Sequence, residues 1–407
     1  MAGLYVHIPF CKRRCAYCDF FSTTLLERRA EYIEALLKEI KERKDEAEEP
    51  IRTIYLGGGT PSTLEADDVA RILETIGTEE TEEITMEANS GDITLEYLQA
   101  IRATGVNRLS IGIQSFQNDL LQLIGRRHNA EQAIEAVHLA QKAGFDNLSI
   151  DLMYALPTQT MAQWKADIET ALRLNVQHIS SYGLMYEEGT ALTQRVTAGE
   201  LSPIDEETEL AMYDYLCQRL KEAGFAHYEV SNFALPNRQA KHNSSYWNGT
   251  PYIGIGAGAH SYIGRVRSWN PEDLEAYICG IKAGTLQRES ETLTDKDIYN
   301  ERIMLGLRTS QGTNGLLSGQ CRGKIEVFIK DGYLTEHNGR IVATQKGLHI
   351  LSPGGWKCEI RVLAWLGSGD RSSWLTECHL ICVLTRPFLG VCTSGKEPPF
   401  PPFLFLE

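Results

Sequence analysis

Three cysteines near the start of the chain have the types and spacing to hold an iron–sulfur cluster. Cys11, Cys15 and Cys18 stand in the segment HIPFCKRRCAYCDF with the spacing C-x3-C-x2-C. A loop this short can point three thiolates at one [4Fe–4S] cluster, which usually takes four cysteine ligands. Three cysteines leave one iron without a protein ligand, and an open coordination position is typical of a reactive metal site. Zinc is the alternative metal, and three buried thiols in a turn are the interpretation without a function.

A repeating pattern of strands and helices must position these cysteines. The clearest helix is predicted over residues 29–43, where apolar residues recur at the spacing of one helical face. Further helices are predicted to start near Ala66, Thr94, Ala130, Met161 and Glu206. Strands are predicted over Leu4–Ile8, Thr53–Leu56, Glu83–Glu87, Arg108–Ile113, Asn147–Leu152, His178–Leu184 and His227–Asn232. Because strands and helices alternate, the pattern indicates parallel strands joined by right-handed crossovers.

We therefore predict an α/β fold, a full or partial (β/α) barrel of the TIM type, with its site at the C-terminal ends of the strands. An open, doubly wound sheet is the alternative. Residues 1–235 are predicted to form the core barrel and residues 236–290 an extension of it. Residues 291–351 are predicted to form a small helical and winged domain with a hairpin that turns at Asn338–Gly339. Residues 352–407 lack a regular pattern and are predicted to be a poorly ordered tail.

The composition excludes several classes of partner. The 407 residues carry a formal net charge of −14, which argues against nucleic acids and anionic membranes as partners. No run of about 18 apolar residues predicts a membrane span, and the N-terminus does not resemble a signal peptide. We therefore expect a cytoplasmic protein, and in that reducing compartment clustered cysteines bind metal or take part in chemistry.

The cysteine segment resembles the signature of the radical S-adenosylmethionine (SAM) superfamily. The surrounding HIPFC…YCDF is similar to the branch of oxygen-independent coproporphyrinogen oxidases and their relatives, and the resemblance covers roughly residues 3–350. It implies a partial radical SAM barrel in which the three cysteines hold the cluster and the open iron binds SAM. The residues that it implies for SAM binding are Tyr5, Tyr17, Gly59, Thr60, Pro61, Glu87, Gln114, Arg126, Asp151 and Leu184.

Each of these residues alone would more often be an ordinary loop or strand-end residue. A Gly-rich turn such as GGGTP is weak evidence by itself, although bare backbone there lets a ligand approach closely. One departure from the family pattern is Ser90, which stands where the family usually has proline three residues after Glu87. The loop after the third predicted strand is therefore expected to differ slightly from that of the family.

A second motif lies in the segment HNSSYW, which contributes His242, Asn243, Tyr246 and Trp247. It resembles the HNxxYW motif of heme chaperones of the HemW type, which are related to the coproporphyrinogen oxidases. A neutral imidazole is a common axial ligand of heme, and Tyr and Trp rings can flank a porphyrin. The resemblance thus implies that these four residues contact heme. A lone histidine is usually not a ligand, and His7 and His260 are the rival candidates.

Two departures favour the chaperones over the oxidases. The oxidases carry a fourth cysteine in their signature and an extension before the first strand, whereas here Asp19 and Phe20 follow Cys18 and the first strand begins almost at once. We therefore expect a heme chaperone that binds heme and delivers it to hemoproteins such as respiratory enzymes. A flavodoxin- or ferredoxin-like protein is the expected electron donor, and a homodimer is expected. The alternative is a coproporphyrinogen III oxidase of porphyrin biosynthesis, and whether SAM is cleaved stays open.

Overall fold

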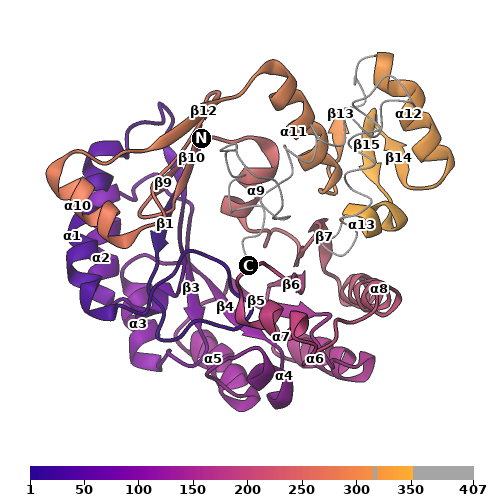
Figure 1. Ribbon diagram of the computed structural model, residues 1–407, viewed down its shortest axis with the longest axis horizontal. Helices are drawn as coiled ribbons and strands as arrows, with labels where there is room; N and C mark the ends of the chain where they lie inside the picture. Colours follow the sequence, from indigo (N-terminus) through magenta and orange to yellow (C-terminus); the bar gives the residue numbers. More distant parts are fainter. Residues whose placement is uncertain (315–318, 352–407) are drawn as a thin grey trace.

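A curved sheet of 12 strands forms the frame of the protein (Figure 1). The computed structural model describes residues 1–314 and 319–351, so the predicted tail over residues 352–407 lies outside the described residues. Seven neighbouring strands of the sheet are parallel, in the order β9-β1-β2-β3-β4-β5-β6. Their bounds are β1 Ala2–Ile8, β2 Ile51–Gly58, β3 Glu83–Asn89, β4 Arg108–Gln114, β5 Leu148–Tyr154, β6 His178–Gly183 and β9 Tyr252–Ile255.

Antiparallel strands extend this parallel region on both sides. β10 (His260–Ile263), β11 (Val266–Trp269) and β12 (Glu289–Thr292) continue the sheet beyond β9. β8 (Asn232–Ala234) and β7 (Ala226–Glu229) continue it beyond β6. Because β12 and β7 are separate edges, the barrel is partial, and the predicted α/β class with a mostly parallel sheet is confirmed.

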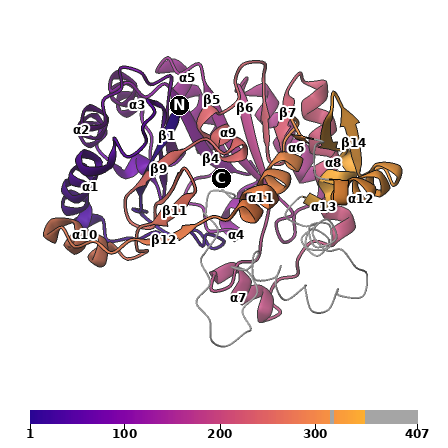
Figure 2. The same ribbon diagram turned by 90° about the horizontal axis from the view of Figure 1, so that it is seen from above.

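Helices cover the outer, convex side of the sheet (Figures 1 and 2). Neighbouring helices of this layer contact one another and form one outer layer, as in a barrel. A doubly wound sheet would carry such a layer on both faces, so this alternative is excluded. The helix predicted over residues 29–43 is confirmed as α1. The helices in this part of the chain are α1 Arg29–Arg43, α2 Ala66–Ile76, α3 Leu95–Ala103, α4 Asn118–Leu123, α5 Ala130–Lys142, α6 Met161–Arg173, α7 Ala191–Thr197 and α8 Glu206–Glu222.

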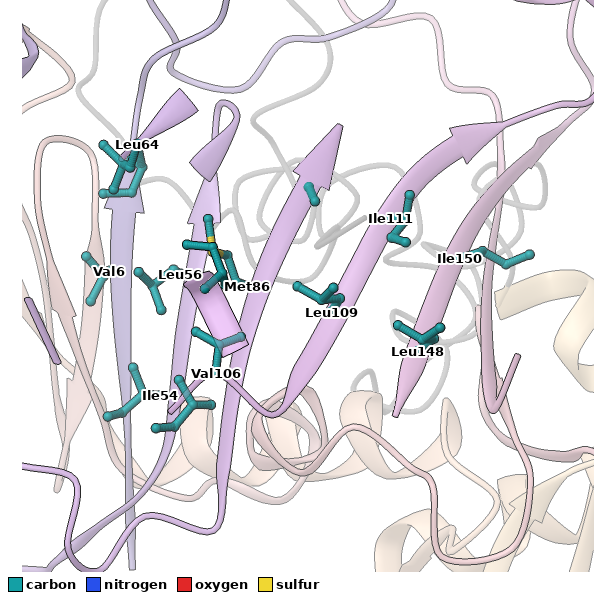
Figure 3. Close-up of a cluster of buried hydrophobic side chains, with 14 of the residues drawn as sticks. Val6, Ile54, Leu56, Leu64, Met86, Val106, Leu109, Ile111, Leu148 and Ile150 are labelled. Atoms are coloured by element: carbon teal, nitrogen blue, oxygen red, sulfur yellow. The ribbon is translucent and has the colours of Figure 1, made fainter. Parts of the chain in front are cut away.

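The two faces of the parallel strands differ in chemistry, because successive side chains of a strand point to opposite faces. Apolar side chains such as Val6, Leu56 and Ile111 are fully buried in the layer between sheet and helices (Figure 3). Each such side chain stabilises the fold by about 1.5–3 kcal/mol. Residues one position away, such as Tyr55 and Ser110, lie on the concave face. That face is polar, so it is suited to contacts with a ligand.

The prediction of a seventh parallel strand over His227–Asn232 is wrong. Residues 230 and 231 form the turn between the antiparallel strands β7 and β8, and this turn contains no Gly or Pro that would have marked it. The parallel position beside β1 belongs instead to β9. Gly254 of β9 packs so closely that a Cβ atom there would collide with the carbonyl oxygen of His260. This close packing explains part of the glycine-rich pattern around β9.

The remaining described elements form the barrel extension and a small C-terminal unit. They are α9 Lys241–Asn248, α10 Leu274–Ala283, α11 Asp295–Leu307, β13 Thr313–Asn314, α12 Gly319–Lys330, β14 Leu334–His337, β15 Arg340–Ala343 and α13 Gln345–Leu351. The predicted hairpin is confirmed, because Asn338 and Gly339 have φ angles of 50° and 72° between β14 and β15. None of the helices in the described ranges combines the length and apolar composition that a bilayer crossing requires.

Candidate functional site

The cysteine loop joins β1 to α1 and ends against the loop that follows β2. The Cys11 Sγ atom is buried and lies 3.4 Å from the Oγ1 atom of Thr60, while the backbone N–H of Cys11 donates to the carbonyl of Thr23 over 2.8 Å. Cys15 and Cys18 are half-buried. Within residues 1–314 and 319–351, no three His, Cys, Asp or Glu side chains are close enough to hold a single metal ion.

The loop after β2 can approach the cysteines only because it contains glycine. The N–H of Gly59 donates to the carbonyl of Ile8 over 2.8 Å. A Cβ atom on Gly59 would lie 2.7 Å from the backbone of Pro9 and 3.1 Å from the Cys11 sulfur. Pro61 then begins the short 3-10 helix η2 (Pro61–Thr63), so Gly59, Thr60 and Pro61 form a fixed turn beside Cys11.

Glu87 of β3 ties this turn to the interior of the barrel. Its Oε1 atom accepts a hydrogen bond from the Tyr55 hydroxyl over 2.7 Å, and its Oε2 atom accepts one from the N–H of Gly58 over 3.1 Å. The Tyr5 ring stacks on Tyr55 with 6.1 Å between ring centres, and the Tyr5 hydroxyl lies 3.0 Å from His7 Nδ1. Burial and the Glu87 charge raise the pKa of Tyr55 well above its usual range, so this phenol stays protonated and donates.

Gln114 and Arg126 lie where β4 ends. Gln114 is buried and has a φ angle of 72°, which residues other than glycine rarely adopt. The Arg126 Nη1 atom donates to the Cys15 sulfur over 3.5 Å, and Nη2 donates to the carbonyl of Gly112. This contact holds the guanidinium of Arg126 beside one of the three sulfur atoms. Arg126 therefore links the end of β4 to the cysteine loop.

Asp151, Leu184 and Tyr17 complete the predicted set. Asp151 of β5 is buried and accepts a hydrogen bond from the Ser110 hydroxyl over 3.2 Å. Leu184 follows β6, and its N–H donates to the carbonyl of Tyr154 over 3.0 Å. Leu184 belongs to an apolar cluster against which Tyr17 packs. The structure thus places the residues predicted for SAM in the cysteine loop, in the glycine turn, and within or after the neighbouring strands β1 to β6.

The second motif forms helix α9, and its histidine is a fully buried side chain. The His242 Nδ1 atom lies 2.9 Å from Thr53 Oγ1 and its Nε2 atom lies 2.7 Å from the Tyr246 hydroxyl. The imidazole also stacks on Tyr55, with 5.3 Å between ring centres. Burial, with a smaller effect of Arg108, lowers the pKa of His242 to about 3. The imidazole is therefore neutral, and both of its nitrogens already have protein partners.

The other two residues of the motif that were predicted to contact a ligand, Tyr246 and Trp247, face a cavity of about 630 Å³. The cavity lies between α9 and strands β9 to β11 on one side and α11, β13 and β15 on the other, and α9 and α11 lie side by side (Figure 2). His242 and Asn243 are buried behind it and do not line it. This placement argues against the prediction that His242 is an axial heme ligand.

The wall of the cavity opposite α9 contains residues that sequence reasoning missed. They are Tyr299 and Arg302 of α11 and Arg340 of β15. No motif marks them, and they follow Trp247 in the chain by more than fifty residues. The packing of α11 against α9, and of β15 against α11, brings them to the same cavity.

The rival histidines are also engaged within the protein. The Nε2 atom of His7 lies 2.9 Å from the carbonyl oxygen of Phe21, and Nδ1 lies near the Tyr5 hydroxyl. His260 is buried and stacks on Trp269, with 5.6 Å between ring centres. Burial lowers the pKa of His7 to about 4 and that of His260 to about 3. Neither imidazole lines the cavity beside α9.

Comparison with known proteins places the chain in a family. The radical SAM superfamily model matches residues 5–171, and the HemN C-terminal domain model matches residues 293–350. Over 315 residues the chain is 41% identical to the heme chaperone HemW of Lactococcus lactis, covering 76% of this chain and 82% of the relative. Over 322 residues it is 36% identical to HemW of Bacillus subtilis, covering 77% and 85%. The chain belongs to the HemW family.

A solved structure shares the fold of this HemW-family protein. Coproporphyrinogen III oxidase (HemN) of Escherichia coli, a radical SAM enzyme, matches with a TM-score of 0.74 over 90% of this chain and 89% of that chain, at 23% identity. Membership in the HemW family implies a [4Fe–4S] cluster and SAM as cofactors. The residues present fit these groups, because three cysteines share one short loop and Cys11 lies against a glycine turn whose backbone carries no side chain at Gly59.

Proposed function

We propose that this protein is a heme chaperone, which binds heme and transfers it to recipient hemoproteins. The observation that carries this function is the position of the HNxxYW helix. Its Tyr246 and Trp247 rings line a cavity large enough for a cofactor, and that cavity is separate from the cysteine loop. The chain covers most of the length of relatives that bear the name heme chaperone HemW. A cavity with aromatic walls suits a flat, apolar macrocycle.

The cluster and SAM occupy the other site. Cys11, Cys15 and Cys18 would hold the cluster, and the iron that they leave open would bind SAM. The chemistry that the cluster supplies when reduced is the cleavage of SAM to methionine and a 5′-deoxyadenosyl radical. The residues assigned to SAM binding are Tyr5, Tyr17, Gly59, Thr60, Pro61, Glu87, Gln114, Arg126, Asp151 and Leu184.

Within the α9 motif we assign His242 to positioning rather than to iron ligation. Its two nitrogens bond Thr53 and Tyr246, so ligation of iron would require both the loss of a hydrogen bond and the exposure of a buried ring. A fixed imidazole orients the Tyr246 ring toward the cavity. Asn243 is buried beside it and supports the same helix. Tyr246 and Trp247 are the residues that contact heme.

The partners follow from this function. The recipients are hemoproteins such as respiratory enzymes, and a flavodoxin- or ferredoxin-like protein supplies the electron to the cluster. The protein acts as a homodimer in the cytoplasm, where a reducing environment keeps the thiols of the cysteine loop free for metal. Residues 1–235, 236–290 and 291–351 act as the core barrel, its extension and the C-terminal domain of this chaperone. The alternative function, oxidation of coproporphyrinogen III, is not favoured, because the likeness to the oxidase shows the fold alone.

A transfer experiment tests the function. The full-length protein is loaded with heme, mixed with an apo-hemoprotein, and the spectrum of the recipient is followed over time. Direct delivery predicts a transfer rate that rises with the concentration of the recipient. Heme bound to serum albumin serves as the control, because it is released passively. A rate that is independent of recipient concentration, as for albumin, would contradict the chaperone function.

A further inference from the structure

The charges around the cavity beside α9 do not balance. Three arginines line it, Arg267, Arg302 and Arg340, together with the carboxyl groups of Glu229 and Glu301. Arg267 is neutralised, because its Nη1 atom lies 2.7 Å from the Glu301 carboxylate. Burial raises the pKa of Glu229 to about 7, which reduces the negative charge that this carboxyl group contributes at neutral pH. The guanidinium groups of Arg302 and Arg340 are left as the excess positive charge.

Neither of these two arginines is paired with a carboxylate in the described part of the chain. Arg302 is exposed on α11 and forms no ion pair or hydrogen bond with the described residues. Arg340 donates to the backbone carbonyl of Gly312 over 2.7 Å and to Asn314 Oδ1 over 2.8 Å. These neutral acceptors hold the Arg340 side chain in place without cancelling its charge. In a chain with a net charge of −14, two unpaired cations at one cavity are a local exception.

The aromatic side chains of the cavity lie mainly on the opposite wall. Tyr246 and Trp247 project from α9, and Tyr252 meets Tyr246 edge to face with 4.8 Å between ring centres. The cavity therefore has an aromatic wall from the barrel extension and a cationic side from α11 and β15. A ligand that satisfies both sides is a flat, apolar ring system with carboxylates at one edge.

We propose that Arg302 and Arg340 bind the propionate carboxylates of a porphyrin whose ring lies against Tyr246 and Trp247. This inference rests on the proposed heme-binding function and adds the part of the ligand that the C-terminal unit recognises. Guanidinium groups bind carboxylates through two parallel N–H···O hydrogen bonds, which fixes orientation as well as charge. Residues 293–350, which match the HemN C-terminal domain, thus supply one half of the site.

The test compares ligands with and without free carboxylates. Hemin and hemin dimethyl ester are each titrated into the full-length protein, and the Soret absorption reports binding. Removal of one charge-assisted contact in Arg302→Gln is expected to weaken hemin binding about tenfold and to leave the ester unchanged. Arg265→Gln is the matched control, because Arg265 is exposed near β11 but does not line the cavity.

Arg340 also holds the loop around Gly312, so the binding of both hemin and the ester is measured for the Arg340→Gln variant. Arg340→Gln is expected to weaken hemin binding about tenfold while the variant binds the ester as the wild type does, which shows that the cavity is intact. Equal affinities of the wild type for hemin and the ester, or wild-type hemin affinity in Arg302→Gln, would overturn the inference. Absence of hemin binding by the wild type would instead overturn the proposed function itself.

Discussion

The cysteine loop and the cavity beside α9 are two sites built in different ways. At the cysteine loop, Cys11 and Glu87 are buried, and each has a partner in the glycine turn, as Cys11 contacts Thr60 and Glu87 accepts a hydrogen bond from the N–H of Gly58. At the cavity the groups come from α9, α11 and β15, and Arg302 is exposed. The first site is rigid and preorganised for one cofactor, whereas the second can admit and release a ligand between two packed units. A carrier of heme requires the second property.

The two sites are also linked through the sheet. β1 leads into the cysteine loop and pairs with β9. β9 in turn pairs with β10, whose Tyr262 lines the cavity. Substitutions in either site are therefore expected to affect ligand binding at that site alone. Substitutions of the residues that hold β9 are expected to affect binding at both sites.

The largest expected effect is the loss of the cluster. Replacing Cys11, Cys15 or Cys18 with Ala is expected to abolish iron incorporation and the visible absorption of the cluster after anaerobic reconstitution, because each thiolate holds its own iron. Heme affinity of the same variant should stay within about twofold of wild type, since single contacts outside a site contribute little. Cys279→Ala, at an exposed position on α10, is the control and keeps its iron. Full iron content in a loop variant would refute the ligand assignment.

The next effect concerns the buried carboxylate that holds β9 and its loop. Glu39 of α1 is fully buried, and its Oε2 atom accepts hydrogen bonds from the N–H of Gly256 over 2.8 Å and from the Tyr277 hydroxyl over 2.7 Å. It also pairs with Arg43 over 2.9 Å. Glu39→Ala leaves Arg43 with Glu46 as its remaining acidic partner and leaves the N–H of Gly256 and the Tyr277 hydroxyl buried without an acceptor, so the free energy of unfolding should fall by about 3–5 kcal/mol.

Urea unfolding measures this change, and both iron incorporation and heme binding should weaken with it. Glu42→Ala is the matched control on the same helix, because Glu42 is exposed and lies 4.0 Å from Lys38. Its effect should stay within about 0.5 kcal/mol. If Glu39→Ala were as stable as this control, the buried network would not be what holds β9.

A smaller effect appears in the pH dependence of stability. The folded-state pKa of His242, about 3, lies below the ordinary value of 6.5, so below pH 6.5 the unfolded chain takes up the proton first. The stability from this residue is complete above about pH 6.5 and is lost as the pH falls toward 3. Between pH 6.5 and pH 5 the wild type should therefore lose about 2 kcal/mol more than His242→Gln.

Unfolding curves at several pH values measure this difference. His138→Gln, at an exposed position on α5, is the control and should keep the wild-type slope. A slope for His242→Gln that equals the wild-type slope would mean that His242 is not buried in the neutral form.

The smallest effect concerns the aromatic wall of the cavity. Trp247→Phe keeps an aromatic ring but reduces the face that can pack on a porphyrin, so heme affinity should fall about fivefold, or about 1 kcal/mol. A Soret titration measures the affinity, and iron content should not change. Trp269→Phe is the control, because Trp269 is buried against His260 and does not line the cavity. Unchanged affinity in Trp247→Phe would remove this ring from the heme site.

The difference between the sites also explains what the sequence could predict. The cysteine loop follows a strand directly, and Glu87, Gln114 and Asp151 lie in three successive parallel strands, so a parallel barrel brings them to neighbouring positions. The α9 motif is local, and its residues could be named as a group. Which of them face a ligand depends on the rotation of α9 against β2, and this packing buries His242 and turns Trp247 to the cavity.

The C-terminal half of the cavity had no local signal. Arg302 lies in a helix whose period predicts only a helix, and Arg340 lies beside a hairpin turn. β9 was also missed, because a strand of four residues with a glycine has no period long enough to recognise. These features depend on tertiary contacts between distant segments, which no spacing along the chain records.

The most direct test of the account compares heme handling with porphyrinogen oxidation in one preparation. The protein is reconstituted anaerobically with its cluster, supplied with SAM and a reductant, and divided between hemin and coproporphyrinogen III. A heme chaperone is expected to give a stable Soret band with hemin and no protoporphyrinogen from the second sample. Formation of protoporphyrinogen without stable binding of heme would contradict it.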